Sequence, residues 1–214
     1  MSKSESKKEV TNNLAPFLEP FGFKHLNVQP GIKFLKKIDN DSIYFFIQFY
    51  ASGDYIFSPF FIGIGKVEKI LKPLFQKYDV DTEPTTVGYQ NAEVILAMHA
   101  LRKENAGTAV ILEKFKSSFK EMYARCAALL DLKEVYSLIK ETHKSKEKGV
   151  DIGGAGVPRR LRFLAIYKLY NDPENFAALL KKFREEEGVY EASPDNHREL
   201  FEEGLKLIQD IKAS

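Results

Sequence analysis

The sequence predicts an α+β fold: an N-terminal helix and a small antiparallel meander sheet, followed by an all-helical C-terminal half packed with them. Apolar residues recur three and four positions apart over residues 10–21, which is a helical period. Aromatic-rich segments separated by short polar turns follow between residues 31 and 64, as in a meander, and the later apolar patterns are helical. Because strand faces need the apolar helix stripes as cover, we expect an α+β unit over residues 1–106 and a helical unit over residues 107–214 in one continuous globular protein.

The predicted N-terminal helix contains Pro16, which favours a kink or a helix in two pieces, and Gly22 is expected to end it. Three strands follow, read from the segments GIKFLKKI, SIYFFIQFYA and YIFSPFFIGI. Both faces of the middle strand are largely apolar or aromatic. We therefore expect that this strand is covered on both sides, or that one of its faces lines a groove.

The remaining elements are expected to be mostly helical. GKVEKILKPLFQK and NAEVILAMHALRK read as helices, with the loop YDVDTEPTT and a short strand at VGYQ between them. The carboxylates of this loop are interpreted as a solvated acidic cluster. From Thr108 onward only helices are expected, and Asp131, Pro158 and the sequences DPE and SPD mark their starts.

The composition indicates a soluble globular protein. The 214 residues are 44% hydrophobic and 29% charged, and the net charge of +2 is spread over two nearly neutral halves, unlike the basic domain of a nucleic-acid binder. The polar first ten residues predict no secretion signal, and the apolar stretch at 43–64 is too interrupted to span a membrane. A single cysteine, Cys126, excludes an internal disulfide and is expected to be buried. We expect a cytoplasmic protein without a cofactor or a bound metal.

The N-terminal segments LAPFLEPFGFKH, FLKKI, IYFFIQFYASG and YIFSPFFIGIG resemble an uncharacterised bacterial family, domain of unknown function 4304. Its members have a helix that ends in a Gly-Phe turn, a short meander with a Q-x-S-like middle strand, and a strand that closes in F-x-x-x-x-G. Here the middle strand reads QFYAS, which departs from that spacing, and the overlap covers roughly the first third of the chain. The resemblance implies a bacterial origin and an α+β fold, and it supplies no active-site residues.

The glycine-rich stretch DIGGAGVPRR, residues 151–160, is the first candidate site. Backbone N–H groups ahead of a helix start can bind an anion, and two arginines can add charge-assisted hydrogen bonds. The stretch has no Walker lysine, follows a helix rather than a strand, and loses one N–H group at its proline, so the alternative is a flexible connection between helices. The candidate ligand-binding residues in it are Gly153, Gly154, Gly156, Arg159 and Arg160.

The aromatic residues between positions 44 and 61 are the second candidate. Aromatic rings on a sheet face can stack on bases, but that use needs interleaved Lys and Arg, and none occurs between Asp41 and Gly65. The alternatives are a core face, a hydrophobic pocket or a protein-binding surface. Tyr50 and Tyr55 would offer hydroxyl groups to a ligand held between the sheet and the glycine-rich stretch.

Two functional hypotheses from different classes follow. The first is a non-enzymatic protein-binding or accessory module with a groove where the sheet meets the helices, because no motif supplies a nucleophile, a metal site or a nucleotide cradle. No catalytic residue is therefore predicted. The alternative is a small-molecule or anion-binding protein, or an enzyme, with its site near residues 153–160. An exposed aromatic face would also favour a homodimer, whereas nucleic-acid and membrane partners are not expected.

Overall fold

The computed structural model describes residues 2–80, 83, 85–104, 106–142, 150–152, 156–185 and 196–211. Within them, one seven-stranded antiparallel sheet has the order β1-β2-β3-β5-β6-β7, with β4 paired to β3. The strands are β1 (Lys24–Val28), β2 (Gly31–Ile38), β3 (Asp41–Phe49), β4 (Tyr55–Phe57), β5 (Phe60–Gly63), β6 (Val87–Tyr89) and β7 (Val150–Ile152). The helices are α1 (Lys3–Leu18), η1 (Glu19–Phe21), α2 (Gly65–Lys77), α3 (Ala92–Lys103), α4 (Thr108–Ala128), α5 (Leu132–Thr142), α6 (Gly156–Leu169), α7 (Pro173–Glu185) and α8 (Asn196–Gln209).

The predicted α+β class is confirmed, and the expected meander forms the centre of the sheet. β2, β3 and the segment made of β4 and β5 are the three predicted strands. The third of them is split at Pro59, which has no N–H to donate to a ladder. Ser58 bridges the split: its N–H donates to the Phe46 carbonyl at 2.9 Å, and its Oγ accepts from the Phe46 N–H at 2.8 Å.

The sheet is larger than the predicted meander. The short strand expected at VGYQ is confirmed as β6, while β1 and β7 are additions. β1 escaped prediction because its side chains are mostly exposed and only Leu26 and Val28 are apolar, which is too short an alternation to indicate a strand. β7 corrects the expectation that only helices follow Thr108. Its three residues are too few to show a strand period, and they become a strand by pairing with β6.

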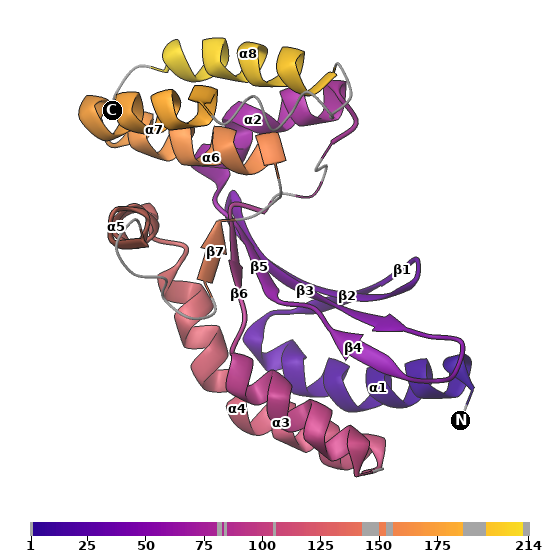
Figure 1. Ribbon diagram of the computed structural model, residues 1–214. Helices are drawn as coiled ribbons and strands as arrows, with labels where there is room; N and C mark the ends of the chain where they lie inside the picture. The colour runs from indigo at the N-terminus through magenta and orange to yellow at the C-terminus, as the bar shows by residue number, and fades with distance from the viewer. Residues whose placement is uncertain are drawn as a thin grey trace.

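One face of the sheet forms the core. α1, α3 and α4 lie on this side, below the sheet in Figure 1. Phe45 of β3 is fully buried there, 5.5 Å from the Phe115 ring of α4, and Phe57 of β4 stacks on the same ring at 4.6 Å. α1 runs through Pro16 as one helix to Leu18, and Gly22 ends the following turn with a φ of 82°, as predicted.

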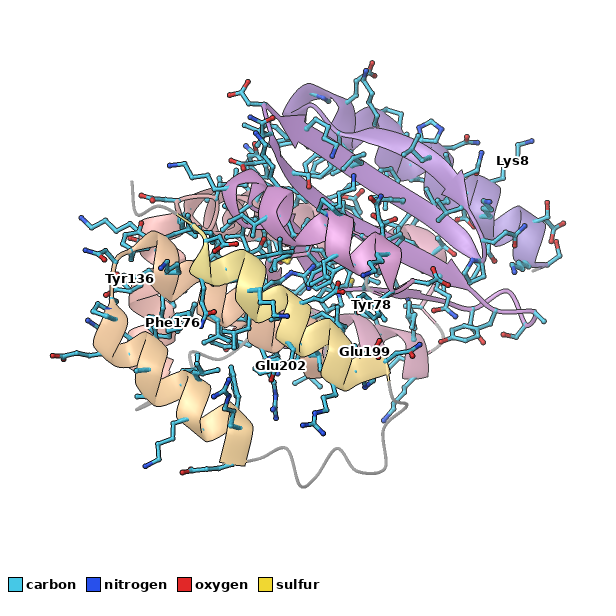
Figure 2. All side chains as sticks on the ribbon, turned by 90° about the horizontal axis from the view of Figure 1, so that it is seen from above. Lys8, Tyr78, Tyr136, Phe176, Glu199 and Glu202 are labelled. Atoms are coloured by element: carbon cyan, nitrogen blue, oxygen red, sulfur yellow. The ribbon has the colours of Figure 1, made fainter. Side chains whose placement is uncertain are left out.

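A second layer of helices extends the hydrophobic core. α2, α6, α7 and α8 lie together above the sheet in Figure 1, and α2 packs against both α6 and α8. Gly204 lets α8 approach α6 closely, since a Cβ there would lie 2.5 Å from Leu161 Cδ1. Figure 2 places Tyr78, at the end of α2, beside the start of α8, and the neighbouring Lys77 pairs with Glu203 at 2.7 Å. Because α2 comes from the first half of the chain and β7 from the second, the two halves interlock.

A buried ion pair joins α2 to α6. The Arg162 guanidinium, fully buried, donates from Nε to Glu68 Oε1 at 2.9 Å and from Nη2 to Glu68 Oε2 at 3.1 Å. Thr86, just before β6, donates its hydroxyl to Glu68 Oε1 at 2.7 Å and accepts from the Ile64 N–H at 3.0 Å. The guanidinium also lies 4.9 Å from the Phe75 ring centre. This network connects the helical layer to the edge of the sheet.

We expect Arg162→Met to lower the free energy of unfolding by about 3–5 kcal/mol, because it leaves the Glu68 carboxylate buried without its countercharge. The double variant Glu68→Met/Arg162→Met should lose clearly less, since no uncompensated charge remains. Urea denaturation of the native protein, the Arg162→Met and Glu68→Met variants and the double variant measures this. A double variant that is as unstable as the sum of its two single variants would contradict the assigned coupling.

Candidate functional site

On the face of the sheet opposite α1 and α4, no helix of the described residues lies over the N-terminal strands. Figure 2, seen from above, shows α2 and α8 beside these strands rather than over them. Strand alternation and the register bring one set of side chains to this side. We call it the open face, and its residues are Lys24, Leu26, Val28, Lys33, Leu35, Tyr44, Phe46, Gln48, Ile56 and Phe61.

Three aromatic rings form the centre of the open face. Tyr44 is buried, whereas Phe46 and Phe61 are half-buried. Their centroids lie 5.2 Å (Tyr44–Phe61), 5.5 Å (Tyr44–Phe46) and 6.0 Å (Phe46–Phe61) apart. Of the two arrangements predicted for the middle strand, β3 thus has the second: one face is core, and the other lines a partly exposed aromatic surface.

Lys33 supplies a cation to this aromatic cluster from the neighbouring strand. It lies opposite Phe46 in the register, and its Nζ is 4.2 Å from the Tyr44 ring centre and 5.3 Å from that of Phe46. The residue is only 7% exposed, yet its Nζ donates to Glu83 Oε2 at 2.5 Å. Glu83 itself is half exposed and belongs to the loop between α2 and β6, which also places Thr85 in hydrogen-bond contact with the Tyr44 hydroxyl.

An apolar hollow of about 290 Å³ adjoins the aromatic cluster. It lies between the β1–β2 turn and strands β3 to β5, and Gly31 belongs to its wall. A Cβ at Gly31 would lie 2.0 Å from the Ile47 carbonyl oxygen, so glycine is required for the close approach of β2 to β3. The side chains that line the hollow are those of Val28, Gln29, Pro30, Phe46, Ile47, Gln48, Ile56, Ser58 and Phe61.

The glycine-rich stretch is described in part. Gly153 and Gly154 lie outside the described residues, and Gly156 begins α6 with a φ of 58°. Arg159 and Arg160 line a small hollow of about 250 Å³ with Gly156 and two phenylalanines. The Arg160 guanidinium donates to the Phe183 carbonyl at 3.2 Å and lies 4.8 Å from that ring's centre. The described part therefore directs the Arg160 side chain toward α7.

Tyr50 and Tyr55 do not join the arginines. They flank the turn between β3 and β4, which lies far from α6 in Figure 1, and neither lines the hollow of the arginines. Tyr50 is 43% exposed. Tyr55 is buried on the core side, where the Arg102 guanidinium lies 4.5 Å from its ring centre and burial raises its pKa.

Sequence reasoning missed the residues that define the open face. The aromatic segment has no Lys or Arg between Asp41 and Gly65, but the cation that contacts its rings is Lys33, one strand earlier. Glu83 was interpreted as part of a solvated loop, and half of its side chain is solvated, but its carboxylate binds Lys33. The signal that would have found Lys33 is the register, because pairing β2 with β3 across the turn at Asp39–Asn40 sets it opposite Phe46.

The remaining chemical groups are structural. Cys126 is buried, and burial raises the pKa of its thiol, so it stays a neutral apolar side chain. Among the described residues, no three His, Cys, Asp or Glu side chains gather as metal ligands would. Tyr167 is fully buried and its hydroxyl has no hydrogen-bond partner among the described residues, whereas the neighbouring Tyr136 donates its hydroxyl to Asp172 Oδ2 at 2.6 Å.

We expect Tyr167→Phe to leave the free energy of unfolding unchanged or to raise it, because it removes a buried hydroxyl without a partner. Tyr136→Phe, the matched variant, should lower it by about 1 kcal/mol through loss of a hydrogen bond. Burial raises the pKa of Tyr167 to about 12, above its value near 10 in the unfolded chain, so the native protein should lose stability as the pH rises from 10 toward 12. The Tyr167→Phe protein should lose less over that range. Urea denaturation at pH 8 and in this alkaline range measures both effects, and a Tyr167→Phe protein less stable than the Tyr136→Phe protein would contradict them.

Comparison with known proteins found no relative of this chain. No family model matches it, and neither a curated protein nor a solved structure does. The resemblance of the N-terminal segment to an uncharacterised bacterial family therefore stays a prediction. In the part of the chain that is described, no helix combines the length and the apolar run that crossing a bilayer requires.

Proposed function

We propose that this chain is a non-enzymatic protein-binding module whose open face takes up an extended, acidic segment of a partner protein. One observation carries the proposal: an uncovered sheet face combines half-buried aromatic rings, an apolar hollow and a buried lysine. Exposed apolar surface bordered by polar groups is typical of interaction sites. Aromatic side chains are also enriched at the centres of such sites, where they anchor a partner.

The edge of the sheet supports an extended partner. β1 pairs with β2 on one side and is the last strand at that end of the described sheet. Its residues are exposed or half-buried, and Leu26 on the open face is 45% exposed. A strand edge offers backbone N–H and C=O groups to an added strand, and alternate side chains of that strand then reach one face. A segment lying along β1 would place such side chains over Val28 and the adjoining hollow.

The charges of this surface favour an acidic partner. Lys24 and Lys33 belong to the open face, and the carboxylate that reaches it comes from Glu83. Glu83 is half exposed and belongs to an acidic loop. Its carboxylate forms an ion pair with Lys33, as a partner's carboxylate would. The ion pair between Lys33 and Glu83 is therefore our model for the contact with a partner's carboxylate. A carboxylate from a partner gains the same charge-assisted hydrogen bond and the same aromatic surroundings.

The aromatic geometry disfavours base stacking. The Phe46 ring meets Tyr44 at 83° and Phe61 at 61°, so the three rings pack edge to face. Single-stranded nucleic acids need flat, exposed ring faces together with a basic groove. The alternative small-molecule site near residues 153–160 has weaker support, because the Arg160 guanidinium already binds a backbone carbonyl of α7.

Selection from a short random peptide library tests the proposal. Enriched peptides should pair an acidic residue with an apolar one two positions away, because alternate residues of an extended chain share a face. Lys33→Met should weaken binding of an enriched peptide about tenfold or more through loss of the charge-assisted hydrogen bond. Glu83→Gln should strengthen it several-fold, since the internal competitor is gone. Titration calorimetry of the purified proteins gives both affinities.

Lys120→Met is the matched control, because Lys120 is an exposed lysine of α4, the helix that packs on the opposite side of the sheet. It should leave peptide binding unchanged. No enrichment, or equal losses in the Lys33 and Lys120 variants, would contradict the proposal. A concentration-dependent dimer that Leu26→Lys abolishes would assign β1 to a second copy instead. Tighter binding of single-stranded oligothymidine than of peptide would assign the face to nucleic acid.

A further inference from the structure

A second, larger hollow lies at the junction of the two layers. It has a volume of about 950 Å³ and shares no residue with the hollow of the open face. Four chain segments meet around it: the β2–β3 turn, the start of α2, the α4–α5 turn and the α6–α7 turn. Ligand pockets are commonly found where separate layers of a fold meet, and their volumes fall in this range.

Four lysines line this hollow, together with the carboxylates of Asp39, Asp41 and Asp131. All four lysines are exposed, and none of them forms an ion pair with a described residue. Lys66, Lys69 and Lys72 follow each other at intervals of three residues along α2. Like charges at that spacing destabilise a helix. Lys66 also stands in the first turn, where the helix dipole disfavours a cation. A bound anion would turn each of these costs into an attraction. The four residues are Lys37, Lys66, Lys69 and Lys72.

Ser42 is an independent sign of a ligand. It is 2% exposed and lines the hollow, and its hydroxyl has no hydrogen bond to any described residue. The register sets it between Lys37 on one side and Gly63 on the other. Because Gly63 has no side chain, the space beside the hydroxyl stays open. The hydroxyl oxygen is accessible from the hollow, so it can donate to or accept from a ligand there.

The carboxylates around the hollow are mostly engaged. Asp41 Oδ1 accepts from the Gly65 N–H at 2.7 Å, and Asp131 Oδ1 accepts from the Lys133 N–H at 2.9 Å. Glu68 is neutralised by Arg162. Asp39 is exposed at the turn. Since Asp41 already caps the first N–H of α2, the attraction for an anion comes from the lysines and the serine rather than from the helix end.

Two turns add apolar residues to the lining of the hollow, together with the polar residues Asp131 and Asn171. Leu130 and Leu132 come from the α4–α5 turn, and Leu169 and Tyr170 from the α6–α7 turn. The Tyr170 ring is held in place by stacking on Tyr136 at 4.3 Å and 10°. The lining thus combines lysines and a hydroxyl with apolar side chains and a fixed aromatic ring. Such a combination suits a ligand that has both a charged group and an organic body.

We propose that this hollow binds a soluble organic phosphate. The phosphate group lies among Ser42, Lys66 and Lys69, and the organic body lies against Leu130 and Tyr170. This site is independent of the open face, so either assignment can fail without the other. A phosphate monoester offers several strong acceptor oxygens, which match two ammonium groups and a hydroxyl donor better than a carboxylate does.

Titration calorimetry with three probes tests the site: AMP, inorganic phosphate and adenosine. AMP should bind saturably. Inorganic phosphate should bind more weakly and adenosine weakest, because each of these two probes has only one of the two parts of AMP. Lys66→Ala/Lys69→Ala should weaken AMP binding at least tenfold. Without ligand, this variant should unfold at the same temperature as the native chain or a higher one, since it relieves like-charge repulsion and adds good helix formers. Ser42→Ala should weaken both phosphate-containing probes several-fold.

Lys8→Ala/Lys120→Ala is the matched control, with the same loss of charge from exposed helix positions outside the hollow; Figure 2 places Lys8 at the outer end of α1. It should leave AMP binding unchanged. Equal weakening in both double variants would overturn the site as non-specific attraction. Absence of saturable binding by both AMP and phosphate would overturn it as well. Binding confined to phosphatidylcholine vesicles containing phosphatidic acid would overturn the soluble ligand and assign the lysines to a lipid headgroup.

Discussion

The bidentate pair between Glu68 and Arg162 is the interaction on which the arrangement of the two layers depends. Glu68 is almost fully buried and Arg162 is fully buried. Their hydrogen bonds join α2, from the first half of the chain, to α6, from the second half. Thr86 extends it to the strand that follows, so α2, α6 and β6 are fixed relative to each other. Apolar packing alone would hold the helices together without defining one orientation, whereas two directed hydrogen bonds to a buried charge do so. We infer that this pair also sets the shape of the lysine-lined hollow, which Glu68 borders.

The two faces of the sheet have different physical roles. On the core side, rings such as Phe45 and Phe115 pack without solvent, and the helices that cover them leave no room for a partner. On the open face, Phe46 and Phe61 keep part of their surface in water beside a cation that is itself almost buried. Holding Lys33 in this position is favourable because Glu83 and two rings surround its ammonium group. A partner's carboxylate that displaces Glu83 keeps the ring contacts, replaces the ion pair and adds contacts of its own.

The sequence allowed the helices, the central meander and the doubly apolar character of β3 to be predicted, because each depends on a local period. It did not reveal β7 or the pairing of Glu68 with Arg162, since both depend on residues far apart in the chain. The same limit explains the sites. The candidate ligand-binding residues were predicted from the composition of two separate segments. In the structure, Tyr50 and Tyr55 lie far from Arg159 and Arg160. Lys33, Glu83 and Ser42 gain their roles from strand register and loop position, which no short motif encodes.

Hydrogen–deuterium exchange with an enriched acidic peptide tests whether the open face and its edge strand form the binding surface. We expect slower exchange in β1 and in the β1–β2 turn when the peptide is bound, with faster exchange around Glu83 as its carboxylate leaves Lys33. Amides of α3, on the opposite side of the sheet, should not change. Protection confined to α3 and α4, or to α6 and α7, with β1 unaffected, would contradict this assignment.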